Sequence, residues 1–520
     1  MCPSGMKGQS RVLLACAAVA LFVTAQASAR TFDGPASTAE YNVGYSGAHA
    51  LRVVVARADG VVDGRIPALR IARVRMSTSD VARASDVRGI RFVQLVRRRV
   101  DETEPGLQAA TGKSAAWEWQ FASAHEDTVP DQVLRAASAV TIAVIDTGAD
   151  LSAPDIAAKS PAVWSQRSGS TDVRDTVGHG TFVAALAAGS VTNGEGIAGF
   201  GGDAKLMVIK AGAGDGSLTD ADEAAAITYA VDHGARIINL SFGGTATTTT
   251  EKNAIDYAAN HGVLIVAAAG NEHLAGNPSF YPAALLQPIG SKGVGGVGLA
   301  VGASTDLGGR ASFSNTGTYI SLAAPGDGVF SAVSADSPAS AFPRVALPGS
   351  LHGLYGYGSG TSFAAPEVSG AAALVMAANP QLGAIDVARV LKESASGDGT
   401  WNSDLGYGVI NVAAAVALAT GTKAESAVAG LRLSARVAKK RFALTATLSS
   451  QLPAVPSAGR AITFERNVHG KWKRITTMRT DAAGRAQATL VRAKGATKWR
   501  ALWAGADDLA AATSKTLKVG

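Results

Sequence analysis

The segment best suited to chemistry is a Gly-Thr-Ser sequence, Gly360 to Ser362, followed by an apolar run of small residues that ends at Asn379. This pattern predicts a serine on the first turn of a buried helix, where free backbone N–H groups and the helix dipole favour negative charge. Ser362 is therefore a candidate nucleophile. Because Ser or Thr before an apolar run is more often a simple helix N-cap, the assignment requires a base, an orienting acid and an oxyanion donor elsewhere in the chain.

Two further segments provide a candidate acid and a candidate base. Asp146 follows directly after the apolar run 141–145 and precedes two small residues, so we expect its carboxylate to be held at the end of a strand. Aspartates in surface turns are commoner, but this position suits an acid that orients a histidine. His179 is flanked by glycines and opens a helix predicted over 182–188. The glycines leave its imidazole room to contact both an acid and a hydroxyl.

Asn271 is the candidate oxyanion donor. It follows the apolar run 263–269, and a side-chain amide held there could donate to an oxyanion that forms beside Ser362. An Asn tolerated in a left-handed turn is the alternative, and it would be preferred if the residue stood alone. His233 and His261 each precede a glycine at the end of a predicted helix, so we interpret them as complements to the helix dipole.

The elements that must position these residues alternate between strands and helices. Apolar runs predict strands at 140–145, 205–211, 236–240, 263–269 and 298–302, and helices are predicted at 220–233 and 251–261. Strands that are apolar throughout indicate a parallel sheet with helices on both faces, so we expect an α/β fold for residues 111–420. In such sheets active groups gather at the carboxyl ends of the strands.

The N-terminus is typical of an exported protein. Two basic residues, the apolar run 12–23 and the small residues 27–29 predict a signal peptide over residues 1–29. The run is too short to span a bilayer stably, and we expect a secreted, extracellular or cell-wall-associated protein without a membrane span. Cys2 and Cys16 both lie in the signal peptide, so the mature chain is predicted to have no thiol and no disulfide.

Residues 30–110 are predicted to form a small α+β unit. The runs 50–56 and 90–100 are predicted as strands and 77–87 as a short helix, followed by a polar linker at 101–106. Its place between the signal peptide and the α/β unit indicates a propeptide. An N-terminal domain that stays attached is the alternative.

The last hundred residues differ from the rest of the chain in their hydrophobic pattern and in their charge. The chain of 520 residues is too long for one core, and its 47% of hydrophobic and 17% of charged residues exclude a disordered protein. Residues 421–520 hold 19 Lys and Arg against 5 Asp and Glu and carry a net charge of +14, whereas the first 420 residues carry −7; the sum is the net charge of +7.

Short alternating segments in this basic region predict strands at 431–437, 441–448, 460–465, 472–478, 486–492 and 498–503. We therefore expect an immunoglobulin-like β-sandwich over 424–520. Its basic surface makes a cell-wall polymer a candidate partner, with plain solvation as the alternative; no nucleic-acid partner is expected.

Taken together, these residues resemble the subtilisin-like serine peptidases. That family's Asp-Thr-Gly, His-Gly-Thr and Gly-Thr-Ser-x-Ala-x-Pro boxes occur here in its chain order, and the resemblance covers about residues 117–420. It implies that Ser362 is the nucleophile, His179 the general base and Asp146 the residue that orients the imidazole. Asn271 and the backbone N–H of Ser362 are then expected to hold the oxyanion.

The resemblance also implies the substrate and the role of the first unit. Ser241, Phe242 and Gly243 resemble the family's strand that pairs with the substrate backbone, and residues 30–110 its inhibitory propeptide. The implied activity is that of a secreted serine endopeptidase acting on extended polypeptides through an acyl-enzyme. Because Phe242 stands where the family often has Leu, we predict an apolar or aromatic residue at P1.

Several departures from the family and one implied cofactor complete the predictions. Phe363 replaces a frequent Met, so activity is predicted to survive dilute peroxide; Phe182 and Glu367 replace frequent histidines. The chemistry requires no cofactor, but the family often binds structural calcium, for which Asp155 and Asn193 are candidate ligands. The competing functions are a catalytically weak scaffold or wall-binding protein acting through the basic β-domain, and acyl transfer to an amine.

Overall fold

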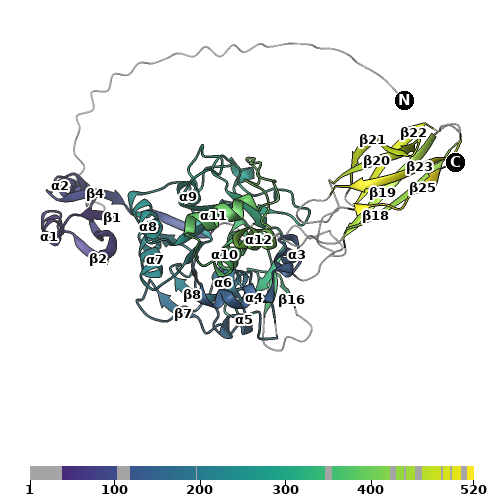
Figure 1. The fold of residues 1–520 in the computed structure, drawn as a ribbon. Helices are drawn as coiled ribbons and strands as arrows, with labels where there is room; N and C mark the ends of the chain where they lie inside the picture. Colours follow the sequence, from purple (N-terminus) through teal and green to yellow (C-terminus); the bar gives the residue numbers. More distant parts are fainter. Residues whose placement is uncertain are drawn as a thin grey trace, which may run out of the picture.

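The computed structural model describes residues 38–101, 118–194, 196–345, 354–421, 429–438, 441–450, 460–481, 484–491, 495–504 and 512–519. The predicted signal peptide with its two cysteines and most of the predicted linker lie outside these residues. Along the chain the described residues form a small N-terminal unit, a large central unit and a β-rich tail (Figure 1).

The central unit is built on a parallel sheet of seven strands in the order β14-β13-β12-β10-β6-β8-β7. The strands are β6 (Thr141–Asp146), β7 (Ala162–Ser165), β8 (Lys205–Lys210), β10 (Ile237–Leu240), β12 (Leu264–Ala268), β13 (Gly298–Ser304) and β14 (Leu322–Pro325). β10 lies between β6 and β12, so the carboxyl ends of these three strands meet at one edge of the sheet. The predicted α/β class and the predicted strands are confirmed.

Helices cover both faces of this sheet because its strands alternate their buried side chains between two cores. Along β6, Ile142 and Val144 belong to one apolar cluster, whereas Ala143 and Ile145 belong to the other. The first face carries α6 (His179–Ala188), α10 (Thr361–Ala378), α11 (Ala384–Glu393) and α12 (Val412–Thr420), and the second carries α7 (Asp220–Asp232), α8 (Thr249–Asn260) and α9 (Ala283–Leu286).

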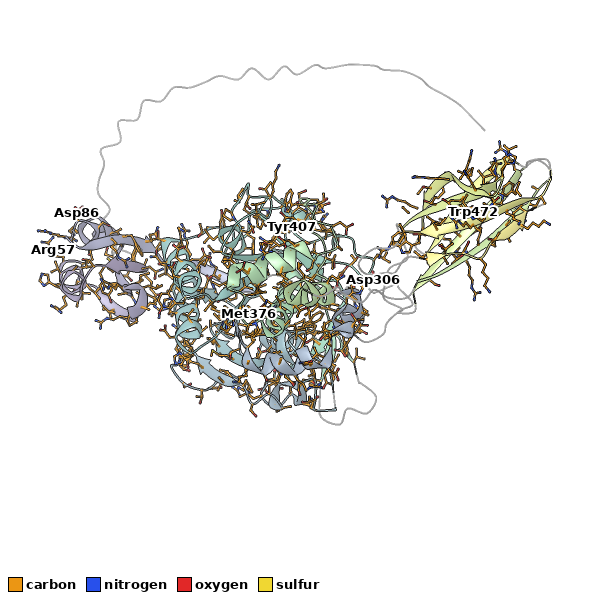
Figure 2. All side chains as sticks on the ribbon, in the orientation of Figure 1. Arg57, Asp86, Asp306, Met376, Tyr407 and Trp472 are labelled. Atoms are coloured by element: carbon orange, nitrogen blue, oxygen red, sulfur yellow. The ribbon has the colours of Figure 1, made fainter. Side chains whose placement is uncertain are left out.

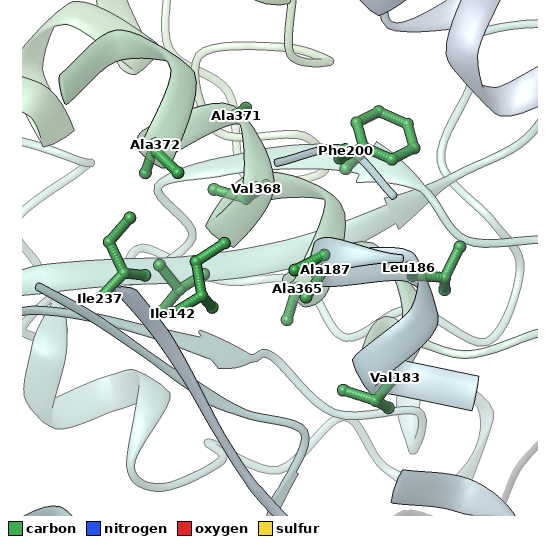
Figure 3. Close-up of a cluster of buried hydrophobic side chains, with 14 of the residues drawn as sticks. Ile142, Val183, Leu186, Ala187, Phe200, Ile237, Ala365, Val368, Ala371 and Ala372 are labelled. Atoms are coloured by element: carbon green, nitrogen blue, oxygen red, sulfur yellow. The ribbon is translucent and has the colours of Figure 1, made fainter. Parts of the chain in front are cut away.

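The first face is packed very closely because α6 and α10 are rich in small residues. Figure 3 shows Ala365, Val368 and Ala372 of α10 beside Ile142 and Ala187 in this core. Within the described part of the chain, α10 is the helix whose length and apolar composition would suffice to cross a bilayer. Because 89% of that stretch is buried inside the protein, we interpret it as a core helix.

Shorter elements complete the central unit. They are α3 (Trp119–Ser123), α4 (Asp131–Ala136), α5 (Pro154–Ala157), β9 (Leu218–Thr219), β11 (Phe242–Gly243) and a small antiparallel sheet of β15 (Val329–Ala332), β16 (Arg344–Val345) and β17 (Tyr355–Gly358). β11 follows β10 almost directly and marks the beginning of the candidate substrate site.

The first unit is an antiparallel sheet with two helices. Its strands are β1 (Thr38–Tyr45), β2 (Val61–Ile66), β3 (Ile71–Ser77) and β4 (Ile90–Leu95), in the order β2-β3-β1-β4, and its helices are α1 (Ala48–Arg57) and α2 (Val81–Ser85). The prediction of a strand at 50–56 is wrong, because this run lies in α1. Ala50, Leu51, Val54 and Ala58 share the buried face at helical spacing. The run of three valines favoured a strand, but packing against the sheet selected the helix.

This unit packs against α7 and α8 of the central unit (Figure 1). Leu69 and Ile71 belong to the same buried apolar cluster as the inner residues of those helices. Asn42 Nδ2 donates to Asp220 Oδ2 over 3.0 Å, and Gln94 Oε1 accepts from Thr249 N over 3.0 Å. After β4 the unit continues in a further strand outside its own sheet, β5 (Arg98–Asp101), so the predicted strand 90–100 is two strands.

The tail forms two facing antiparallel sheets, as the alternating pattern predicted. One contains β18 (Ala429–Val437), β19 (Arg441–Ser450) and β22 (Arg485–Val491); the other contains β20 (Ala461–Val468), β21 (Lys471–Arg479), β23 (Thr497–Trp503), β24 (Ala512–Thr513) and β25 (Leu517–Val519). Phe442 of the first sheet meets Trp499 of the second edge-on, with ring centroids 5.4 Å apart. On the outside, Arg500 lies 4.6 Å above the ring of Trp472, which Figure 2 labels. The shared core of the two sheets confirms a β-sandwich.

Candidate active site

The structure brings the predicted acid and base into direct contact. Asp146 is the last residue of β6 and His179 is the first residue of α6, and His179 Nδ1 lies 2.8 Å from Asp146 Oδ1. Both side chains are buried, with 3% of His179 and 1% of Asp146 exposed. Thr147 N also donates to Asp146 Oδ1 over 2.8 Å. A carboxylate held in this way fixes the orientation of the imidazole.

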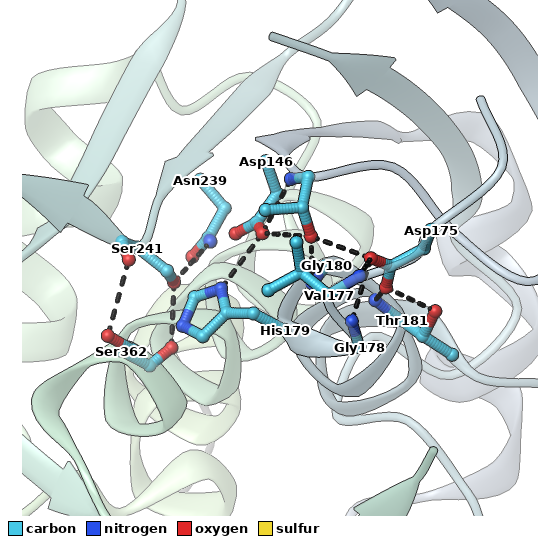
Figure 4. A network of polar contacts seen from close by, with 11 residues as sticks. Asp146, Asp175, Val177, Gly178, His179, Gly180, Thr181, Asn239, Ser241 and Ser362 are labelled. Atoms are coloured by element: carbon cyan, nitrogen blue, oxygen red, sulfur yellow. Dashed lines mark hydrogen bonds and ion pairs between the residues drawn. The ribbon is translucent and has the colours of Figure 1, made fainter. Parts of the chain in front are cut away.

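A second aspartate, which the sequence reasoning missed, fixes the start of α6. Asp175 is fully buried and its two oxygens accept from the backbone N–H groups of Gly178 and Thr181, each over 2.8 Å, and from the Thr181 hydroxyl. Thr147 Oγ1 also donates to Asp175 over 2.9 Å and accepts from Gly180 N over 2.9 Å. Figure 4 shows that this network ties the end of β6 to the first turn of α6. Asp175 is therefore a positioning residue for His179.

Gly180 is required by this close approach. A Cβ at this position would overlap the carbonyl oxygen of Gly148 and lie 3.0 Å from Asp146 Oδ1. The glycine therefore permits β6 and α6 to approach closely enough for the Asp146–His179 contact.

Ser362 lies on the first turn of α10, beside the end of β10. Its hydroxyl donates to the Ser241 carbonyl oxygen over 3.2 Å, and the Ser241 hydroxyl donates to the Ser362 carbonyl oxygen over 2.7 Å. In Figure 4 the His179 ring lies between Asp146 and this pair of serines. The predicted nucleophile, base and acid therefore gather where β6, β10 and two helix N-termini meet.

Asn271 is oriented by the residue that precedes the serine. Its Oδ1 accepts from Thr361 N over 2.9 Å, which directs the other half of the amide elsewhere. Asn271 Nδ2 is buried and has no hydrogen-bond partner among the residues that the structure describes. A buried donor without a partner is costly, so a donor kept in this state marks a site that a ligand atom would complete.

Aromatic rings pack beside His179. Phe363 lies with its ring centroid 5.6 Å from that of His179 and 4.4 Å from that of Phe182, and both phenylalanines are fully buried. Phe182 and Phe363, two of the three departures from the family's frequent residues, therefore contact each other. Glu367, on the same helix, is fully buried, and burial raises its pKa well above the usual range.

The predicted substrate strand is paired, and its partner is a strand of the first unit. β5 lies between β11 and β9, antiparallel to both, with Asp101 opposite Phe242 and Val100 opposite Gly243. Ser241 and Gly243 are fully or nearly fully buried, and the Phe242 side chain belongs to the cluster under α7 and α8. The backbone of β11 makes main-chain pairs with β5, whereas its phenylalanine points into the core.

The residues near Asp155 do not fit a calcium ion in their present arrangement. The Asp155 carboxylate accepts from Asn193 Nδ2 over 3.2 Å, from Ile197 N over 3.0 Å and from the Tyr355 hydroxyl over 2.9 Å. These three neighbours donate hydrogen bonds to the carboxylate, whereas calcium requires six to eight oxygen ligands. The described residues contain no group of three or more His, Cys, Asp and Glu that could hold a metal ion.

Comparison with known proteins agrees with this fold. Residues 137–408 match the model of the subtilase family of peptidases. The chain therefore belongs to the subtilase family.

Three relatives illustrate the extent of the similarity. A thermophilic serine proteinase of Bacillus sp. strain AK1 is 34% identical over 54% of this chain and 62% of its own length. Thermitase of Thermoactinomyces vulgaris is 33% identical over 46% of this chain and 75% of its own. The crystal structure of fervidolysin from Fervidobacterium pennivorans, described as a keratinolytic enzyme, superposes with a TM-score of 0.60 at 23% identity over 90% of this chain and 71% of its own. The chain spans about three fifths of the length of the Bacillus proteinase and of the fervidolysin sequence, 62% and 59%.

Proposed function

We propose that this subtilase is a secreted serine endopeptidase that hydrolyses peptide bonds of extended polypeptides. The observation that carries the proposal is the buried contact of 2.8 Å between His179 Nδ1 and Asp146 Oδ1, next to the helix that begins at Thr361 with Ser362 on its first turn. Serine hydrolases use a buried Asp–His pair beside a serine to activate its hydroxyl.

In this mechanism Ser362 Oγ attacks the carbonyl carbon of the scissile bond while His179 Nε2 takes the hydroxyl proton. Asp146 stays ionised and stabilises the charged imidazole through Nδ1. His179 then gives the proton to the leaving amine, and the acyl group remains on Ser362. A water molecule, deprotonated by His179, hydrolyses this ester and restores the serine.

The negative charge that develops on the carbonyl oxygen is assigned to two donors. These are Asn271 Nδ2 and the backbone N–H of Ser362 at the N-terminus of α10. The amide is supported in this role because Thr361 N fixes its Oδ1 and its Nδ2 has no partner among the described residues. Donors placed in advance where charge develops need no reorganisation during the reaction.

Substrates are proposed to bind as an extended strand against β11. Main-chain hydrogen bonds give affinity without reading side chains, which suits unfolded or extended polypeptides. The apolar or aromatic preference at P1 stays a proposal that rests on the family resemblance, because the Phe242 side chain lies in the core. A peptide library cut chiefly after basic residues would contradict it.

Labelling with a fluorophosphonate tests the catalytic proposal directly. The wild-type protein is expected to be labelled on Ser362 and to lose peptide hydrolysis in parallel, whereas Ser362→Ala is not labelled. Absence of labelling in a folded wild-type protein would favour the scaffold hypothesis. Ligation products in excess amine would show acyl transfer to an amine.

The first unit, residues 30–110, is proposed to be a propeptide that follows a signal peptide at 1–29. The support is the position of β5, which lies between β9 and β11 where a substrate would lie. Mass spectrometry of the secreted wild-type protein should give a mature N-terminus between residues 103 and 111. A mature protein that retains residues 38–101 would show that the unit is a permanent domain.

Two accessory proposals concern the tail and calcium. Residues 424–520 are proposed to attach the enzyme to an acidic wall polymer, because the segment is strongly basic; deleting it should lower retention on cell envelopes and leave hydrolysis of small peptides unchanged. A structural calcium ion remains a prediction of the family resemblance that the geometry at Asp155 does not favour. A melting temperature unchanged by a chelator would remove it.

A further inference from the structure

A buried arginine of β5 lies in a pocket between the two helices that border the candidate substrate site. Arg99 is 1% exposed. Its Nε donates to Glu223 Oε2 of α7 over 3.3 Å, and its Nη2 lies 2.8 Å from Glu251 Oε1 of α8. Its Nη1 donates to the carbonyl oxygen of Ala246 over 2.7 Å. All three nitrogens of the guanidinium group are therefore engaged by groups of the central unit.

The pocket is strongly acidic and closed to water. Neither Glu223 nor Glu251 is exposed, and Asp220 lies at the start of α7 with its carboxylate accepting from Arg97 N over 2.9 Å. Burial, and after it the charge of Glu251, raises the pKa of Glu223 well above the usual range, while Arg99 acts against this shift. Burial lowers the pKa of Arg99, but the charges of Glu223, Glu251 and Asp220 outweigh burial and raise it. Two buried carboxylates that contact the same guanidinium group need this cation between them.

The register of β5 places this pocket relative to the nucleophile. Because β5 runs antiparallel to β11, a peptide in its place runs toward Ser241, whose carbonyl oxygen accepts from Ser362 Oγ. The peptide residue opposite Ser241 is then the P1 residue, the residue opposite Phe242 is P2, and the residue opposite Gly243 is P3. The position of Arg99, one residue earlier, corresponds to P4.

We propose that Glu223 and Glu251 form a specificity pocket that selects arginine at P4 of the polypeptide substrate, and that Arg99 occupies the same pocket when β5 lies in the substrate site. This inference rests on the proposed peptidase function. Arginine is selected over lysine because its planar group reaches two carboxylates and the Ala246 carbonyl oxygen at once, whereas a single ammonium group cannot span them. The enzyme therefore prefers arginine-containing extended segments in which the arginine precedes the cleaved residue by three positions.

The test uses the processed, secreted enzyme and four peptides that differ only at P4, which carries arginine, lysine, citrulline or alanine. Citrulline keeps the shape of arginine and removes its charge. The expected kcat/KM for the arginine peptide is about 10- to 100-fold above that for the citrulline peptide, with lysine between them. Equal values for arginine and citrulline would overturn the pocket while leaving the peptidase proposal intact. Failure to cleave any of the four would instead contradict the peptidase proposal.

A pair of variants assigns the preference to the two carboxylates. In Glu223→Gln/Glu251→Gln the ratio of kcat/KM for arginine over citrulline should fall toward one. Asp256→Asn is the matched control, because this exposed aspartate lies on α8 and pairs with Lys252 outside the pocket; here the ratio should stay that of the wild type. Both peptides are measured on one preparation, so a smaller folded fraction cancels. A ratio unchanged in the double variant would refute the assignment, and if that variant does not fold, the wild-type peptide comparison still decides the proposal.

Discussion

Two buried polar sites border β11, and they are stabilised in different ways. The Asp146–His179 contact is made and supported within the central unit: Asp146 accepts from Thr147 N, and Asp175 accepts from backbone N–H groups at the start of α6. The pocket of Glu223 and Glu251 contains two buried carboxylates, and its cation, Arg99, comes from another unit of the chain.

The difference agrees with the two roles proposed for these sites, catalysis for the first and substrate selection for the second. Backbone donors hold one oxygen of Asp146 and both oxygens of Asp175, so the geometry of the first site does not depend on an occupant. The two carboxylates of the second site contact one cation from a different segment, and we propose that this dependence lets the site discriminate between ligands. The first unit supplies such a cation together with a strand for main-chain pairing.

Removing the nucleophile tests the self-contained site with the largest expected effect. Ser362→Ala should lower kcat for peptide hydrolysis by a factor on the order of 10⁶, the size known for subtilisin, a member of the same family. If processing is autocatalytic, this variant also keeps residues 30–110 attached, as mass spectrometry would show. Processing of Ser362→Ala to the wild-type terminus would indicate another protease.

Removing the oxyanion donor should have the next largest effect. Asn271→Ala is expected to lower kcat by about 10²- to 10³-fold with little change in KM, again the size known for subtilisin. Asn271→Asp keeps the oxygen that accepts from Thr361 N but lacks the donor. Activity retained in Asn271→Asp would show that the oxygen, and not the Nδ2 donor, is the important half of the amide.

Asp175 tests whether the site is held by its own hydrogen bonds. Asp175→Ala should lower the free energy of unfolding by about 3 kcal/mol, because several buried donors lose a charged acceptor, and should lower kcat because His179 is less well positioned. Asp172→Ala is the matched control: this exposed residue accepts from Arg174 N over 3.2 Å outside the network. Denaturant unfolding and kcat for the two variants check the prediction, and equal behaviour would contradict the positioning role.

Glu126 extends the comparison to a buried carboxylate whose ionisation is opposed by neighbouring acids, and its expected effect is the smallest. Burial, with smaller contributions from the charges of Asp127 and Glu118, raises the pKa of Glu126 to about 8. Because the folded pKa lies above the unfolded value of about 4.3, the protonated acid stabilises the fold at low pH, and this stability is lost as the pH rises through 8. Glu126→Gln should therefore be more stable than the wild type by about 2 kcal/mol at pH 9, with the difference shrinking toward pH 4. Thermal unfolding at both pH values measures this, and a difference that does not change with pH would contradict it.

The candidate catalytic residues could be located from the sequence because each stands in a local pattern with its own physical reason. Asp146 and Asn271 follow apolar strands, and Ser362 opens an apolar helix, so each was tied to the end of a predicted element. Asp175 could have been found by a weaker signal, since it lies four residues before His179, at a distance suited to capping the start of α6. The strand predicted at 50–56 failed because three valines favour a strand locally, whereas the helical face of α1 is buried only in the folded unit.

No local pattern indicated the acidic pocket. Glu223 and Glu251 belong to different helices, and Arg99 belongs to a third segment near the end of the predicted strand 90–100. The sequence by itself determined the α/β class, the tail's sandwich and the residues of the candidate active site, because hydrophobic periodicity and element ends are encoded within short windows. Tertiary structure alone decided that two carboxylates 28 positions apart face one guanidinium group, because only packing of α7 against α8 brings these charges together where water cannot screen them.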